Sequence, residues 1–278
     1  MKTITLPEAL SSFDETDIQV HDYHAQAEST KQQVDLSMNT FSFLQEGYKE
    51  VHSDVKSIAI SNDDFLLMKA GKCLMTEKLT GVNNTYRSIL LFFSSDLVSQ
   101  FIKKYSISVS NNTPRKTVQS IPYDGYLRSY AESLTDLSHL SPSNRNRILQ
   151  VKFEELMLYL LDKFGADFFN SLKVKNDAEA HFKEVIENNK LNKLTLSELA
   201  FLCNMSLSTF KRTFEKHFQL PPSKWFQEKR LEYAAYLLKN DEKRASDIYL
   251  EIGYESLTNF VKAFKAKYNV TPKQYQSG

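Results

Sequence analysis

The chain has 278 residues, 41% of them hydrophobic and 25% charged, and a formal net charge of +1. Its length predicts two domains, and its apolar content is enough for ordinary globular cores. The two cysteines, Cys73 and Cys203, exclude a disulfide framework and fit a reducing compartment. The opening MKTITLPEAL lacks the apolar run of a signal peptide, and the longest apolar run, Ile89–Phe93, is too short to cross a membrane. We therefore expect a cytoplasmic protein with no membrane contact.

The near balance of charge hides an asymmetry along the chain. From Ala178 onward the net charge is +4, whereas the residues before it carry a net charge of −3. A basic C-terminal part joined to an acidic N-terminal part suits a phosphate-binding module attached to a sensor.

The first predicted domain, residues 1–169, begins with strands. From about Val34 to Phe93, short runs rich in β-branched and aromatic residues are bounded by Gly, Asn and Asp. This rhythm predicts the strands of a sandwich or barrel. From about residue 95 to 164 the hydrophobic period becomes helical. Pro122 is expected to open one helix, and Ser143 to open another that ends at Phe164.

The last of these helices, about Asn144–Phe164, is apolar on more than one side. Such a helix is buried on more than one side. Two interpretations stay open: the helix is enclosed within its own subunit, or one stripe packs on the strands and the other on a second copy of the chain. In the second case the chain is a homodimer, and the predicted interface residues are Val151, Met157, Leu158 and Leu161.

A short polar segment, residues 170–177, is the predicted interdomain linker, and residues 178–278 form the predicted second domain. Seven helices are expected there. The central one, about Ser223–Lys239, starts after Pro221–Pro222 and has a length of roughly 25 Å. That length helps to set the helices on either side of it about one turn of B-DNA apart, some 34 Å.

The same helix-turn-helix pattern occurs twice in this domain, at Leu194–Phe218 and Arg244–Tyr268. Each copy has a short apolar helix, a pivot residue that tolerates positive φ, and a second helix capped by serine. The aligned pairs are Asn204 with Gly253, Met205 with Tyr254, Ser206 with Ser256 after a one-residue insertion, and Phe214 with Phe264. Two such motifs at a fixed separation predict binding to duplex DNA.

The region from about Ala178 to Tyr275 resembles the DNA-binding domain of AraC/XylS-family transcription regulators. The residues that carry the resemblance are SELAFLCNMSLSTFKRTFEKHF, KRLEYAAYLL and DIYLEIGYESLTNFVKAFKAKYNVTPKQY. Two departures occur, Tyr249 where the family usually has alanine and Gln276 where it usually has arginine. Neither is at a reading position.

The resemblance implies which residues of the second helix in each motif face the bases. These residues are Ser208, Thr209, Lys211 and Arg212 in the first motif, and Thr258, Asn259 and Lys262 in the second. The residue pattern agrees, because Phe210, Phe214, Phe260 and Phe264 form buried stripes at a spacing of four. Ser206, Lys216, Ser256 and Lys265 are the expected phosphate contacts. Lys267 is expected to meet phosphate or solvent, and Arg230 to be a structural ion-pair partner.

The strand-rich half resembles the cupin-like regulatory domain of the same family. Cupin enzymes carry a histidine-rich metal motif, but His21, His24 and His52 have neither its spacing nor its companion glutamate. His21 and His24 are expected before the first strand, on the surface. No phosphate-binding glycine loop and no catalytic constellation emerges. We therefore expect no metal, no cofactor and no enzymatic activity.

These patterns predict a bacterial transcription regulator with a sensing and dimerising N-terminal domain and a DNA-binding C-terminal domain. Activation through RNA polymerase is implied by the family resemblance. The N-terminal domain would respond to a small molecule or to a regulatory protein, and a ligand-sized cavity within Val34–Phe93, as opposed to a filled barrel, would favour the small molecule. The alternative is a cupin-type metal-dependent enzyme fused to a DNA-binding anchor.

Overall fold

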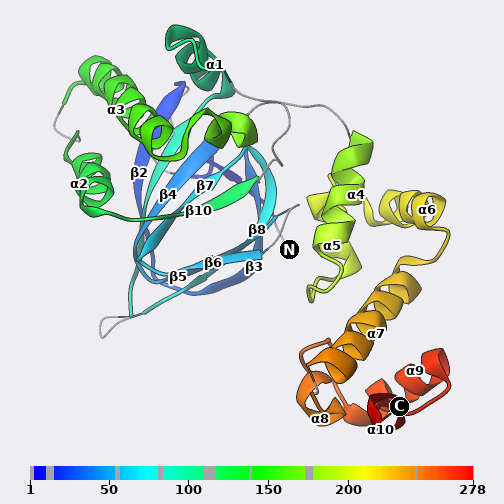
Figure 1. Ribbon diagram of the computed structural model, residues 1–278. Coiled ribbons are helices and arrows are strands. Elements are labelled where there is room, and N and C mark those ends of the chain that lie inside the picture. The colour runs from blue at the N-terminus through cyan, green and yellow to red at the C-terminus, as the bar shows by residue number, and fades with distance from the viewer. Residues whose placement is uncertain are drawn as a thin grey trace. The chain divides into compact units, whose positions relative to one another are not determined.

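The computed structural model describes residues 3–10, 16–53, 57–80, 84–108, 117–137, 140–172, 178–241 and 243–277. The chain divides into two compact units, Met1–Ala180 and His181–Gly278. The strands gather in the first unit, whereas the second is built of helices (Figure 1). The fold is therefore α+β, as the sequence predicted. Within the predicted linker 170–177, residues 173–177 lie outside the described residues.

The described strands of the first unit form two five-stranded sheets. The order in the first sheet is β1 (Ile4–Leu6), β3 (Ser29–Leu36), β8 (Gly71–Lys78), β5 (Tyr48–His52) and β6 (Ser57–Ile60). The order in the second sheet is β10 (Val118–Pro122), β7 (Asp64–Met68), β4 (Asn39–Glu46), β9 (Tyr86–Phe93) and β2 (Ile18–Ala25). Neighbouring strands are antiparallel, except that β1 runs parallel to β3.

The second sheet is buried on both faces, which explains why the end of β9 reads ILLFF without polar alternation. Successive side chains of a strand point to opposite faces. Ile89, Leu91 and Phe93 belong to the core shared with the helices. Leu90 and Phe92 belong to a second core, together with residues of the first sheet. One face of this sheet therefore packs on helices and the other lines the space between the sheets.

Three helices follow the strands: α1 (Ser95–Lys104), α2 (Gly125–Ser133) and α3 (Pro142–Phe164). Short 3-10 helices are present at Thr135–Leu137 and Ala166–Leu172. The Phe153 ring of α3 lies 5.2 Å from the Phe93 ring, and the Tyr130 ring of α2 lies 5.9 Å from the Phe43 ring. These contacts anchor the helices on the outer face of the second sheet.

The structure corrects two predictions about the first unit. Strands β1 and β2 precede Val34, where the sequence predicted none. The sequence pattern did not predict β2, because the outward side chains of this strand are polar. Pro122 ends β10 and pairs with Asp64 of β7, and it does not open a helix. A proline is tolerated there because β10 is an edge strand.

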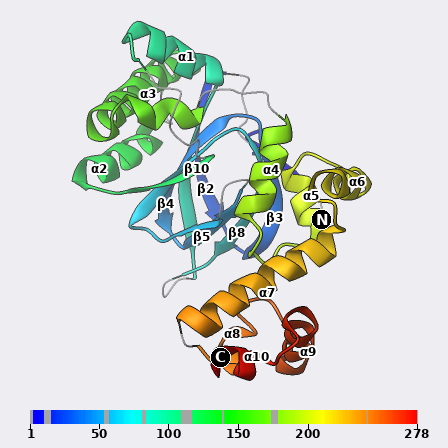
Figure 2. The same ribbon diagram turned by 45° about the vertical axis from the view of Figure 1, so that its right-hand side comes forward.

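Helix α4 (Ala178–Asn188) begins at the end of the first unit and lies mostly in the second. The second unit also contains α5 (Leu196–Leu202), α6 (Leu207–Phe218), α7 (Pro222–Asn240), α8 (Ala245–Ile248), α9 (Leu257–Tyr268) and α10 (Pro272–Ser277). Helix α7 connects a first group, α4–α6, with a second group, α8–α10 (Figures 1 and 2). Phe214 of α6 packs on Trp225 in the first turn of α7, with ring centroids 5.5 Å apart. Helix α8 ends at Ile248.

Candidate DNA-binding surface

The turns of the two helix-turn-helix motifs repeat each other down to single hydrogen bonds. Asn204 and Gly253 both have positive φ, +57° and +88°. After them, Met205 N–H donates to the Ala200 carbonyl and Tyr254 N–H donates to the Tyr249 carbonyl, each at 2.9 Å. The first and second helices of each motif are therefore held at their junction by the same local geometry.

The second helix of each motif also starts in the same way. The Ser206 hydroxyl accepts from Thr209 N–H, and the Ser256 hydroxyl accepts from Asn259 N–H, both at 3.2 Å. These bonds satisfy one of the free N–H groups at each helix start. The remaining N–H groups and the positive end of the helix dipole suit a phosphate at both positions.

Each second helix buries one stripe and exposes another. Phe210 and Phe214 of α6 and Phe260 and Phe264 of α9 are fully buried. Six of the predicted base-reading residues are exposed and the seventh, Thr209, is half-buried. The exposed six are Ser208, Lys211, Arg212, Thr258, Asn259 and Lys262.

The exposed cations of α6 and α9 are without ion pairs in the described residues. These cations are Lys211, Arg212, Lys216, Lys262 and Lys265. Elsewhere in the unit, by contrast, Lys190 pairs with Glu187 at 3.2 Å and Lys229 pairs with Glu232 at 2.9 Å. Unpaired cations on two equivalent helices are available to phosphates and to guanine edges.

Two of the predicted reading hydroxyls have partners at the start of α6. Ser206 Oγ lies 3.0 Å from Ser208 Oγ and donates to Thr209 Oγ1 at 2.9 Å. Thr209 thus contributes to the cap of the helix. The exposed end of this helix presents Lys211 and Arg212 as its strongest donors.

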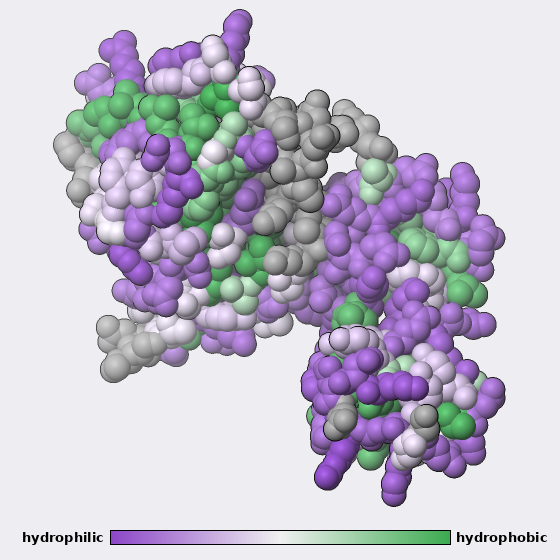
Figure 3. All heavy atoms as spheres, viewed as in Figure 1, coloured by the Kyte–Doolittle hydropathy of each residue, from purple (hydrophilic) through white to green (hydrophobic). Residues whose placement is uncertain are grey.

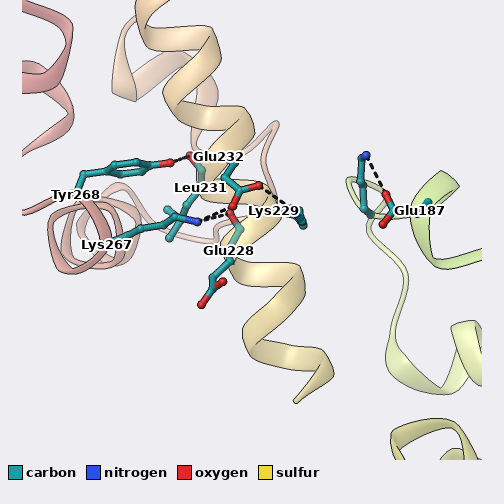
Figure 4. Close-up of polar contacts among 8 residues, drawn as sticks. Glu187, Glu228, Lys229, Leu231, Glu232, Lys267 and Tyr268 are labelled. Carbon is teal, nitrogen blue, oxygen red and sulfur yellow. Dashed lines mark hydrogen bonds and ion pairs between the residues drawn. The ribbon is translucent and has the colours of Figure 1, made fainter. Parts of the chain in front are cut away.

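Lys267 was predicted to reach phosphate or solvent, but its side chain does not extend outward from α9. Figure 4 shows it reaching across to α7. Its ammonium donates to the Glu228 carbonyl at 3.1 Å and to the Glu232 carboxylate at 3.0 Å. The adjacent Tyr268 hydroxyl donates to the Leu231 carbonyl at 3.4 Å. We call these contacts of Lys267 and Tyr268 the α9 latch.

The charge on Glu232 is stabilised by hydrogen bonds from two lysines, Lys229 and Lys267. Hydrogen bonding from Lys229 is the main cause that lowers its pKa, and Lys267 lowers it further, while partial burial opposes both. The sequence did not indicate this latch, because Lys267 and Glu232 are 35 positions apart.

Arg230 makes no ion pair in the described part of the chain, so its expected role is wrong. It lies against the turn of the second motif instead. A Cβ atom at Gly253 would come within 3.3 Å of its Nη1 atom. Glycine is therefore suited to this turn both by its positive φ and by the close approach of Arg230.

The sequence matches a helix-turn-helix domain family over residues 199–278, a range that begins inside the first motif and includes the whole second motif. Residues 39–172 match the family described as ExsA N-terminal regulatory domain. The chain thus combines an ExsA-like N-terminal regulatory domain with an AraC-type helix-turn-helix domain.

Two curated relatives and one solved structure show how much of the chain is matched. The virulence regulon transcriptional activator VirF of Yersinia enterocolitica is 33% identical over 129 residues, 46% of this chain and 48% of VirF. The chain thus spans about half the length of the first curated relatives it matches. The HTH-type transcriptional regulator ExsA of Pseudomonas aeruginosa is 22% identical over 241 residues, 84% of each chain. A crystal structure of apo ToxT from Vibrio cholerae is 13% identical with a TM-score of 0.44, covering 95% of this chain and 98% of ToxT.

The histidines considered as metal ligands lie on two strands of the first unit, His21 and His24 on β2 and His52 on β5. His21 is buried in β2, where burial lowers its pKa, so the prediction of a surface position was wrong. His24 lies 3.3 Å from Asp22, and His52 lies 3.3 Å from Glu50. Among the described residues, no group of three or more His, Cys, Asp or Glu side chains could hold a metal ion. No helix in the same residues is long and apolar enough to cross a membrane.

The outer face of α3 exposes two of the four residues predicted for a dimer interface. Val151 is 66% exposed and Leu158 is 38% exposed. Ile148 was not among the predicted interface residues, but it is also exposed and extends their stripe. Figure 3 shows an apolar area in the region where Figure 1 places α3. Met157 is fully buried in the subunit core, and Leu161 packs against that core. Met157 was therefore wrongly assigned to the interface.

Proposed function

We propose that this chain is a sequence-specific DNA-binding regulator that activates transcription from promoter DNA in the bacterial cytosol. The observation that supports it most is the repetition in α6 and α9 of one capped, phenylalanine-backed helix with unpaired polar side chains on its outer face. Arg212 is suited to guanine O6 and N7, and Asn259 to adenine N6 and N7. Lys216, Lys265 and the N-terminal ends capped by Ser206 and Ser256 would meet the phosphates.

A binding titration against a cognate promoter fragment tests this proposal. Arg212→Ala and Asn259→Ala should each lose about 1–3 kcal/mol of binding free energy and relax preference at one base pair. The two relaxed positions should lie about one helical turn apart. Lys190→Ala is the matched control, because it removes a cation of the same unit that is already paired with Glu187. Parent-like binding by both reading variants would contradict the proposal.

Dimerisation is the second part of the proposal, with the exposed stripe of α3 as the contact between two copies. Val151→Glu should give folded monomers that bind the promoter more weakly, because it puts a charge into an apolar contact. Gln150→Glu adds the same charge beside the stripe and should leave the dimer intact. Leu161→Glu should unfold the first unit, because Leu161 packs against its core. Light scattering with circular dichroism distinguishes these results, and a parent chain that is monomeric at micromolar concentration contradicts this part.

We further propose that a small molecule controls the chain through the first unit. The support is a cavity of about 690 Å³ between the two sheets. Ligand-binding pockets have volumes of about 300–1,000 Å³. Control by a regulatory protein is the alternative, and contact with RNA polymerase is an expectation from the family. Promoter activity of the full chain with and without a purified candidate ligand tests this part.

A further inference from the structure

The cavity between the sheets has apolar walls and one charged cluster. Its apolar lining comes from both sheets and includes Val34, Leu36, Met68, Met75, Leu90 and Phe92. The segment Thr3–Leu10 lines one side. Lys49, Glu77 and Tyr23 add polar groups to the wall. A ligand here would bury an apolar body and place one polar end at this cluster.

Lys49 is the most unusual residue of the cavity, since it is only 2% exposed. Its ammonium donates to Ser42 Oγ at 3.1 Å and lies 3.4 Å from a Glu77 carboxylate oxygen. It also lies 6.0 Å from the centre of the Tyr86 ring. An ammonium has three N–H groups. Two described partners therefore leave one N–H of Lys49 available to a ligand.

The groups around Lys49 cancel its charge. Glu77 provides the opposite charge, and its other carboxylate oxygen accepts from the Tyr23 hydroxyl at 3.4 Å. Burial, followed by the charge of Glu77, raises the pKa of Tyr23 to about 12. The same two causes hold the pKa of Tyr86 well above its ordinary value. Both tyrosines remain neutral, and the Tyr86 hydroxyl is buried without a hydrogen-bond partner among the described residues.

This balance decides what kind of polar end the cavity accepts. A carboxylate bound by Lys49 would lie within a few ångströms of Glu77, and the repulsion is strong where water is excluded. The cluster also has no net positive charge that would offset the hydration that the anion loses on burial. An uncharged acceptor such as an amide or hydroxyl oxygen takes the free Lys49 N–H without either penalty. A hydroxyl or amide hydrogen can also donate to the cluster.

We propose that the cavity binds an uncharged amphiphile, a molecule with an apolar chain and an amide or hydroxyl end placed at Lys49 and Glu77. This inference rests on the proposed small-molecule control and specifies the ligand class. It excludes alkyl carboxylates as preferred ligands.

Calorimetric titration of the full chain with three probes of equal chain length tests the proposal. Decanamide and decan-1-ol should bind with a Kd about tenfold or more below that of decanoate, since the charged probe meets Glu77. Met75→Trp should weaken binding of all three, because its larger side chain takes up part of the cavity. Decanoate binding as tightly as the uncharged probes, or no binding of the uncharged probes, would overturn the proposal.

A charge-neutralising variant sharpens the test. Glu77→Gln keeps the shape of the side chain and leaves Lys49 unbalanced, so preference should reverse toward decanoate. Glu50→Gln is the matched control, because Glu50 follows Lys49 on β5 and its side chain points to the opposite face of the sheet. It should keep the parent preference, and reversal in both variants would contradict the assigned role of Glu77. Should Glu77→Gln fail to fold, the three-probe comparison on the parent chain still decides.

Promoter binding is measured separately on the same preparations without a probe. Selective probe binding with no promoter binding would sink the regulator proposal and leave the ligand class standing. Promoter binding without selectivity among the three probes would contradict the ligand class and leave the regulator proposal standing.

Discussion

In the first helix-turn-helix motif, α6 is held against α7 by aromatic rings, whereas in the second motif α9 is held there by polar contacts as well. Phe214 contacts the rings of Phe182, Phe210, Phe218, Trp225 and Phe226 at centroid distances of 4.5–6.4 Å. Its counterpart Phe264 contacts three rings, and the α9 latch adds the polar bonds to Glu228, Leu231 and Glu232.

The first helices of the two motifs differ in length and in their caps. Helix α5 starts with a reciprocal cap, in which Glu198 N–H donates to Thr195 Oγ1 at 3.2 Å and Thr195 N–H donates to Glu198 at 2.6 Å. Helix α8 is only four residues long, and Arg244 N–H donates to Asp247 at 3.2 Å. The second helix is thus held on α7 by buried rings in the first motif, and by rings together with polar bonds in the second.

The largest expected effect comes from removing the central ring of each motif. Phe214→Ala should lower the free energy of unfolding by about 3–5 kcal/mol, because it leaves a cavity among five rings. Phe264→Ala should cost less, because fewer rings surround it. Urea unfolding followed by circular dichroism measures both, and the single tryptophan, Trp225, reports the first motif by fluorescence. Equal losses would remove the distinction drawn between the motifs.

The sequence predicted what local signals encode. The pivots Asn204 and Gly253, the serine caps and the phenylalanine spacing are set by neighbours within a few positions, so both motifs could be identified. The family resemblance added the outer faces of α6 and α9. Pairings between distant elements gave no signal: Lys267 with Glu232, Arg230 with Gly253, and Lys49 with Glu77. Met157 was misplaced for the same reason, because the stripe that meets the core depends on the packing of α3.

The turn of the second motif should be the less tolerant of the two to a side chain. Gly253→Ala should lower the free energy of unfolding by about 1–2 kcal/mol, because φ of +88° disfavours a side chain and Arg230 is close. Asn204→Gly should change it little, since Asn204 already tolerates its φ of +57°. Thermal unfolding of the two variants measures the difference. A Gly253→Ala protein as stable as the parent would show that Arg230 and the backbone shift without cost.

The α9 latch should matter for local order more than for global stability. Lys267→Met should reduce global stability by less than about 1 kcal/mol, as partly exposed ion pairs do. Amide hydrogen exchange in the last turn of α9 should nevertheless rise, because its bonds to α7 are lost. Lys265→Met is the contrasting variant: it should leave exchange unchanged and reduce the salt slope of DNA binding by about 1. Faster exchange in both variants would indicate a general effect of charge removal on α9.

The smallest expected effect is the change in stability with pH that arises from the Glu232 carboxylate. The pKa of Glu232 is lowered in the folded chain, chiefly by Lys229, so the folded state favours the ionised carboxylate. The stabilisation is therefore fully present above the ordinary glutamate pKa of about 4.3 and is lost as the pH falls through the lower folded value. Glu232→Gln has no such carboxylate. Its stability deficit relative to the parent should shrink as the pH is lowered from 7 toward about 3, measured by urea unfolding at each pH. A deficit that stays constant with pH would mean that Glu232 acts through its shape and not its charge.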